Sequence, residues 1–122
     1  MSIRILAVDD SSTIRGLVSR ALKQAGFEVY LACDGVEGVG TLPDADPHLI
    51  ITDINMPKMD GFGLIESVRA SAEYRSVPIL VLTTESGTEL KARARKCGAT
   101  GWIVKPFEDD RLIAVIDKVL GR

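Results

Sequence analysis

A chain of 122 residues is long enough for one domain with one hydrophobic core and too short for two. Hydrophobic residues make up 46% and charged residues 26%, proportions that fit a globular protein and exclude a disordered one. The net charge of −2 gives no overall field that would attract nucleic acid or an anionic membrane, and the apolar runs are too short to span a bilayer. We therefore expect neither nucleic-acid binding nor membrane insertion.

The first predicted elements are a strand and a helix. Residues 3–8 form an apolar stretch that is typical of a buried strand. From Ile14 onward apolar residues recur at steps of three and four, which predicts a helix with one face turned inward. Ser11 or Ser12 can cap the start of this helix, and Gly26 can end it.

The same alternation continues along the chain. Further strands are predicted over 27–32, 48–52, 79–82 and 102–104, and further helices over 35–42, 62–70, 88–97 and 109–120. The helix over 35–42 has the weakest pattern, because each of its glycines costs up to about 1 kcal/mol relative to alanine.

Five apolar strands separated by amphipathic helices predict a parallel sheet covered by helices on both faces. Right-handed crossovers place the carboxyl ends of all strands at one edge, where such sheets bind ligands. Five units are too few for a closed eight-stranded barrel. We predict an α/β domain over residues 1–122, a doubly wound, flavodoxin-like five-stranded sheet with strand order 2-1-3-4-5.

Polar residues follow the strands at that edge. Asp9 and Asp10 follow the first strand and Asp53 the third, while Thr83 follows the fourth and Lys105 the fifth. Two carboxylates about 4 Å apart repel each other by about 4 kcal/mol at an effective dielectric constant of 20, so the cluster requires positive charge. Lys105 can supply one unit. A hard divalent cation, Mg²⁺ above all, can supply the rest, because the candidate ligands are all oxygens. An aspartate alone often only caps a helix, but this joint placement indicates a functional site.

A carboxylate beside Mg²⁺ can act as a nucleophile toward phosphorus and form an aspartyl phosphate. Mg²⁺ and a lysine then neutralise the transferred group, and a hydroxyl bonds its remaining oxygen. The sequence contains neither GxxxxGK[ST] nor GxGxxG before a helix, which argues against a nucleotide site. The single histidine, His48, precedes the third strand at the opposite edge, so we expect no histidine-based catalysis. Cys33 and Cys97 lack the spacing of a metal site and predict reduced thiols in a cytoplasmic protein.

Four segments resemble the receiver domain of bacterial two-component response regulators. They are VDDSSTIR (8–15), DINMPKMDG (53–61), VLTT (81–84) and KPF (105–107). They occur in the order and spacing of the family, and the likeness covers the whole chain. The resemblance implies that Asp53 accepts a phosphoryl group from a phosphohistidine of a sensor kinase. The protein would then be no enzyme, beyond catalysing its own phosphorylation and dephosphorylation.

The same match assigns roles to individual residues. Mg²⁺ would be bound by the carboxylates of Asp10 and Asp53, by the main-chain carbonyl of Asn55 and, through water, by Asp9. Thr83 would move inward and bond one phosphoryl oxygen, and Lys105 would pair with another. The peptide bond between Lys105 and Pro106 is commonly cis in the family.

Within the family the chain is most similar to the stand-alone chemotaxis regulators. Asn55 and Glu85 match the pair that flanks the phosphate there. Trp102 occupies the position of a tyrosine that turns inward on activation; its indole is bulkier and can only donate a hydrogen bond. The family generally docks partners on the face formed by the fourth helix, the fifth strand and the last helix. The basic residues on this face are Lys91, Arg93, Arg95 and Lys96. They would suit an acidic partner peptide, or they could simply form a solvated helix face.

The resemblance thus implies a monomeric switch that receives its phosphoryl group from a chemotaxis-type histidine kinase or a histidine phosphotransfer protein. Its output partner would be a protein such as the flagellar motor switch, so that it controls flagellar rotation, with a phosphatase as a further partner. A phosphorelay intermediate or phosphate sink would use the same site. A small Mg²⁺-dependent phosphohydrolase of the haloacid-dehalogenase type is a third reading. It would need a second aspartate where Asn55 stands, and a cap for which the chain has little room.

Overall fold

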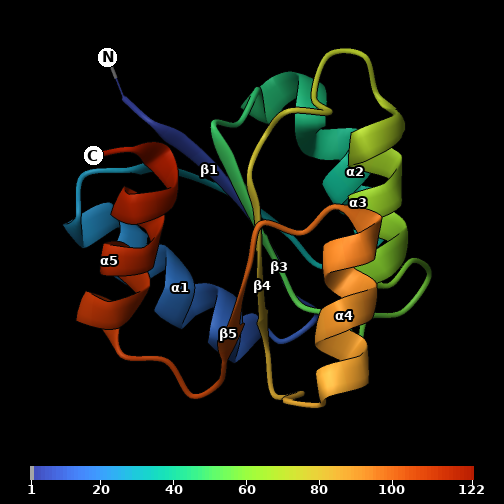
Figure 1. Ribbon diagram of the computed structural model, residues 1–122. Helices are drawn as coiled ribbons and strands as arrows, with labels where there is room; N and C mark the ends of the chain where they lie inside the picture. Colours follow the sequence, from blue (N-terminus) through green and yellow to red (C-terminus); the bar gives the residue numbers. More distant parts are fainter. Residues whose placement is uncertain (1) are drawn as a thin grey trace.

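The computed structural model describes residues 2–122 of the chain (Figure 1). Strands and helices alternate throughout: β1 (Arg4–Val8), α1 (Ser12–Gln24), β2 (Glu28–Ala32), α2 (Gly35–Ala45), β3 (Leu49–Thr52), α3 (Gly61–Ala70), β4 (Ile79–Thr83), α4 (Thr88–Cys97), β5 (Gly101–Val104) and α5 (Asp109–Leu120). Each predicted strand and helix is present, and all predicted boundaries except the end of α2 lie within a few residues of the observed ones.

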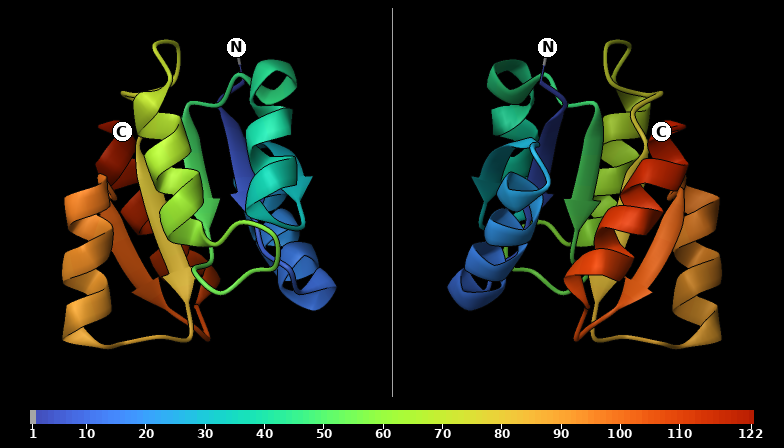
Figure 2. Two further views of the ribbon diagram at one scale, coloured as in Figure 1. Left: turned by 90° about the vertical axis from the view of Figure 1, so that its right-hand side faces the viewer. Right: turned by 90° about the vertical axis from the view of Figure 1, so that its left-hand side faces the viewer.

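All neighbouring strands pair in parallel, in the order β2-β1-β3-β4-β5. Helices α1 and α5 cover one face of the sheet, and α2, α3 and α4 cover the other (Figures 1 and 2). This arrangement confirms the predicted doubly wound, flavodoxin-like fold. The registers align the strand ends, so that Val8 of β1 lies opposite Thr52 of β3, and Thr52 lies opposite Val81 of β4.

The two faces of the sheet have separate hydrophobic cores. Successive side chains of a strand point to opposite faces, so in β1 the side chain of Leu6 packs beneath α2, α3 and α4, while that of Ile5 packs beneath α1 and α5. The central strand β3 is buried along its whole length, as a parallel strand covered on both sides should be. Because this strand is held in the core, the position of the next residue, Asp53, at the end of the sheet is fixed.

Helix α2 is longer than the sequence predicts. It continues past Leu42 to Ala45, although Pro43 lies inside it and removes a main-chain hydrogen bond. Leu42 and Ala45 are both buried, and their packing stabilises a final turn that proline would otherwise disrupt. Two apolar side chains of the first two helices are exposed to solvent, Leu17 of α1 at 42% and Val36 of α2 at 51%.

Helix α4 has the thinnest buried face. Ala94 is its single buried side chain, with Leu90 and Cys97 half-buried, as the charged pattern predicts. The helix begins after Gly87 without a side-chain cap and ends at Gly98, whose φ of 116° lies in the left-handed region. None of the helices in the part of the chain that the structure describes is both long and apolar enough to cross a bilayer.

Candidate functional site

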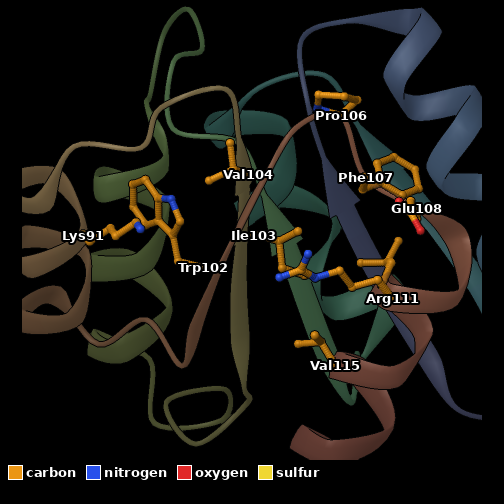
Figure 3. Close-up of a pocket in the computed structure, with 10 residues that line it drawn as sticks. Lys91, Trp102, Ile103, Val104, Pro106, Phe107, Glu108, Arg111 and Val115 are labelled. Carbon is orange, nitrogen blue, oxygen red and sulfur yellow. The ribbon is translucent and has the colours of Figure 1, made fainter.

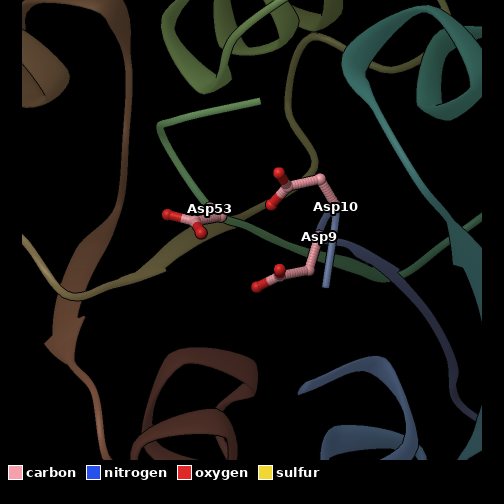
Figure 4. A group of neighbouring side chains, drawn as sticks. All are labelled: Asp9, Asp10 and Asp53. Atoms are coloured by element: carbon pink, nitrogen blue, oxygen red, sulfur yellow. The ribbon is translucent and has the colours of Figure 1, made fainter. Parts of the chain in front are cut away.

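Three aspartates meet at the carboxyl edge of the sheet. Because Val8 and Thr52 are paired, the residues that follow them, Asp9 and Asp53, leave the sheet side by side. One carboxylate oxygen from each of Asp9, Asp10 and Asp53 lies within 4.8 Å of the others (Figure 4). The sequence predicted this convergence from the topology, and the structure confirms it.

Asp9 is held from several sides. Its amide donates to the carbonyl of Ala32 at 3.1 Å, and its Oδ1 accepts the amide of Ser11 at 2.9 Å. Its own carbonyl accepts Nη1 of Arg15 at 2.6 Å. Ser11 also caps α1, with its side chain accepting the amide of Ile14 at 3.2 Å. Sequence reasoning missed Arg15, because an arginine in the first turns of a helix gives no signal of a contact with the preceding loop.

Asp53 is buried, and its main chain is fixed by the sheet. Its amide donates to the carbonyl of Val8 at 3.0 Å, and its Oδ1 accepts the amide of Ile54 at 2.6 Å. A side chain at Gly61 would collide with the main chain of Asp53, so only glycine allows the start of α3 to pack this closely. The loop between β3 and α3 therefore holds Asp53 in one position.

Lys105 joins two of the three carboxylates. Its Nζ donates to Oδ2 of Asp9 at 2.7 Å and to Oδ2 of Asp53 at 2.9 Å, and its side chain is only 8% exposed. Burial alone would lower the pKa of Lys105, but the hydrogen bonds and negative charges of the two aspartates outweigh it and raise that pKa. The peptide bond to Pro106 is cis.

One ammonium group does not balance three carboxylates. Asp10 is exposed and, among residues 2–122, makes no ion pair, so its oxygens are free for a ligand. The three carboxylates supply only oxygen donors at a spacing that a small cation can bridge. This donor set and the uncompensated charge fit Mg²⁺.

Glu85 connects the loop after β3 with strand β5. Its Oε1 accepts Nδ2 of Asn55 at 3.1 Å, and its main-chain carbonyl accepts Nε1 of Trp102 at 3.0 Å. The amide of Glu85 donates to Oγ1 of Thr83, the fully buried last residue of β4, at 3.3 Å. The family resemblance implied that Asn55 and Glu85 form a pair, but nothing in the sequence indicated that the Glu85 carbonyl accepts the indole.

Trp102 lies between two cavities. The larger, of about 300 Å³, is formed by β5 and α5 with Lys91 of α4 on its rim, and Phe107 and Arg111 are among its lining residues (Figure 3). The smaller, of about 80 Å³, lies between α4 and β5. Glu85 and Trp102 thus connect the loop after β3 with the face around the larger cavity.

Comparison with known proteins identifies the class of domain that this fold and site define. The model of the response regulator receiver domain matches residues 5–117. The chain therefore belongs to the response regulator receiver family, whose members act in phosphotransfer signalling and are not enzymes in the ordinary sense.

Individual relatives place the chain among CheY-type chemotaxis regulators. It is 39% identical over 121 residues to the chemotaxis protein CheY1 of Helicobacter pylori, covering 98% of both chains. The structure of the chemotaxis response regulator CheY4 of Vibrio cholerae superimposes with a TM-score of 0.93 at 44% identity, covering 98% of this chain and 99% of that one. The receiver domain of the Pseudomonas aeruginosa sensor histidine kinase PA1611 has a TM-score of 0.91 at 24% identity, with full coverage of both chains. It supports the shared fold, and that structure holds a magnesium ion in its active-site cleft.

Proposed function

We propose that the protein is a phosphorylation-controlled chemotaxis switch in which Asp53 accepts a phosphoryl group from a phosphohistidine of a kinase. The observation that carries the proposal is the setting of Asp53, a buried carboxylate beside two others and 2.9 Å from Lys105. In this proposal residues 1–122 act as one cytoplasmic receiver unit. It is monomeric and catalyses only its own phosphorylation and dephosphorylation.

In the proposed transfer every residue of the cluster has a role, and Asp53 has two. An oxygen of Asp53 attacks phosphorus, the bond from phosphorus to the histidine nitrogen breaks, and an acyl phosphate forms. Lys105 pairs with an oxygen of the transferred group. Asp10, Asp53 and the main-chain carbonyl of Asn55 would hold Mg²⁺, and Asp9 would assist through water. The bound cation supplies positive charge that offsets the charge of the phosphoryl group.

Readout begins at Thr83. Once its hydroxyl turns toward the phosphoryl group, the amide of Glu85 loses its present acceptor and the loop after β4 shifts. Trp102 is hydrogen-bonded to the carbonyl of that same loop, so we propose that it moves with it. Asn55 and the Glu85 side chain flank the phosphoryl group.

The proposed output face surrounds the cavity beside Trp102. Two cations, Lys91 and Arg111, and one acid, Glu108, line it beside apolar side chains such as Val104, which is 38% exposed. A lining that is net basic and partly apolar suits an acidic, partly hydrophobic peptide. We propose a protein such as the flagellar motor switch as the partner, rather than nucleic acid or a membrane, with a phosphatase as a further partner.

Phosphorylation tests the proposal directly. Acetyl phosphate with Mg²⁺ should add one acid-stable, hydroxylamine-labile phosphate to the wild-type protein, and Asp53→Asn should abolish it. Asp60→Asn is a matched control, because Asp60 lies in the same loop but serves as the cap of α3. Full labelling of the Asp53→Asn variant would overturn the assignment of the nucleophile.

Partner binding separates a switch from a phosphorelay intermediate or sink, which would use the same residues. A pull-down with and without fluoroberyllate, a phosphoryl mimic, should capture the output protein only with the mimic. Capture of histidine phosphotransfer proteins alone would favour the relay. A phosphohydrolase of the haloacid-dehalogenase type is disfavoured, because Asn55 has no acidic proton and its amide already bonds Glu85.

A further inference from the structure

Arg69, in the last turn of α3, gives its hydrogen bonds to main-chain carbonyls. Its Nε and Nη2 donate to the carbonyl of Gly98 at 3.0 and 2.7 Å, and its Nη1 donates to those of Arg75 and Val77 at 2.9 and 2.6 Å. Within residues 2–122 it forms no ion pair with a carboxylate. The rigid fork of a guanidinium can hold several such acceptors at once. Arg69 thereby ties α3 both to the end of α4 and to the segment that leads into β4.

Gly98 fits this contact in two ways. Its positive φ ends α4 in a conformation that favours glycine, and a Cβ there would lie 2.8 Å from the side chain of Arg69. The amides of Gly98 and Ala99 both donate to the carbonyl of Ala94, at 3.1 and 2.9 Å, which closes the last turn. The negative end of the helix dipole also favours a cation at this position.

Among residues 2–122 no side chain anchors the amino end of α4 in a comparable way. It begins without a side-chain cap, directly after the loop that carries Glu85. Only Ala94 of this helix is buried, so its amino end adds no buried side chain to the core. One further tie to α3 lies midway along the helix, where the guanidinium of Arg93 stacks 3.9 Å from the ring centre of Phe62.

We propose that Arg69 is the pivot of the switch, fixing the carboxyl end of α4 so that a change at Thr83 swings only its amino end. This inference rests on the proposed function and specifies how its output face is regulated. Movement of the loop around Glu85 shifts Lys91 relative to Trp102 and reshapes the rim of the larger cavity. The Gly98 end stays in place and gives the helix a defined direction of motion.

The anchor itself is tested without any ligand, by amide hydrogen exchange of residues 84–99. Arg69→Met should speed exchange at Gly98 and Ala99 by about tenfold or more, because a charge-assisted clamp is lost. Arg69→Lys retains the charge but not the fork, and should show a smaller effect of the same sign. Arg93→Met is the matched control: it removes the other tie to α3 and should leave these two amides within about threefold of wild type. Unchanged exchange at Gly98 and Ala99 in both Arg69 variants would overturn the proposal.

The pivot is tested by adding Mg²⁺ and fluoroberyllate. In the wild-type protein the rate of amide exchange should change over residues 84–92 and stay constant at Gly98 and Ala99. In Arg69→Met the rate should change at Gly98 and Ala99 as well. An equal response at both ends of α4 in the wild type would refute the pivot. A wild-type protein that responds nowhere contradicts the proposed function and the pivot together, while the ligand-free comparison still decides whether Arg69 anchors α4.

Discussion

Asp53→Asn should hardly destabilise the metal-free protein, although it removes a buried ion pair. At 2.9 Å and an effective dielectric constant of 20, the attraction between Lys105 and Asp53 is worth about 6 kcal/mol. Asp9 and Asp10, within 4.8 Å, each repel Asp53 by at least about 3.5 kcal/mol, or about 7 kcal/mol together. The two effects nearly cancel, and asparagine also avoids the desolvation of a charge. We expect the free energy of unfolding to fall by no more than about 1 kcal/mol, or to rise.

Urea unfolding with a chelator and then with saturating Mg²⁺ measures both parts of this prediction. Mg²⁺ at a hundred times its dissociation constant should stabilise the wild type by about 2.7 kcal/mol, and the variant by at least about 1 kcal/mol less, because a charged ligand is missing. Asp60→Asn should gain as much from Mg²⁺ as the wild type does. Two results would refute the reasoning from repulsion. One is a free energy of unfolding for Asp53→Asn in chelator that is lower than that of the wild type by more than about 2 kcal/mol. The other is an equal stabilisation of the wild type and Asp53→Asn by Mg²⁺.

Three further predictions follow from the same contacts. Lys105→Met leaves the carboxylates without their cation and should lower the free energy of unfolding by about 3–5 kcal/mol, with much of the loss restored as Mg²⁺ is titrated in. Gly35→Ala places a Cβ 2.5 Å from the carbonyl oxygen of Met59 and should lower the free energy of unfolding in urea by more than about 2 kcal/mol. In the same helix, the Cβ of Gly40→Ala meets nothing within 4 Å, so this variant should be more stable than the wild type by about 0.5–1 kcal/mol. Asp60→Ala removes the acceptor for the amide of Gly63 and should lower the melting temperature by an amount equivalent to about 1 kcal/mol, without loss of acetyl phosphate labelling.

The sequence was sufficient to predict the fold, because the signals that determine it are local. The apolar run over 49–52 predicts a buried parallel strand, and the steps of three and four after Ser11 predict a helix; both are present. The end of α2 was wrong because proline usually stops a helix, and the burial of Leu42 and Ala45 that offsets Pro43 depends on packing with distant segments.

The acidic cluster was also predictable, since parallel strands bring residues from far along the chain to one edge. The contacts that hold its surroundings were not. Arg15 bonds the carbonyl of Asp9, Arg69 bonds that of Gly98, and Trp102 bonds that of Glu85. Every residue has a main-chain carbonyl, so an acceptor of this kind leaves no trace in the sequence.

The bond from Trp102 to Glu85 has a consequence for how such a protein can vary. Its acceptor is the main-chain carbonyl, which any amino acid at position 85 provides, whereas the bond to Asn55 depends on the carboxylate. Substitution at this position can therefore alter the surroundings of Asp53 while the tether of the indole is retained. A substitution at position 85 can thus change the chemistry at the acidic edge and leave the orientation of the Trp102 side chain as it is.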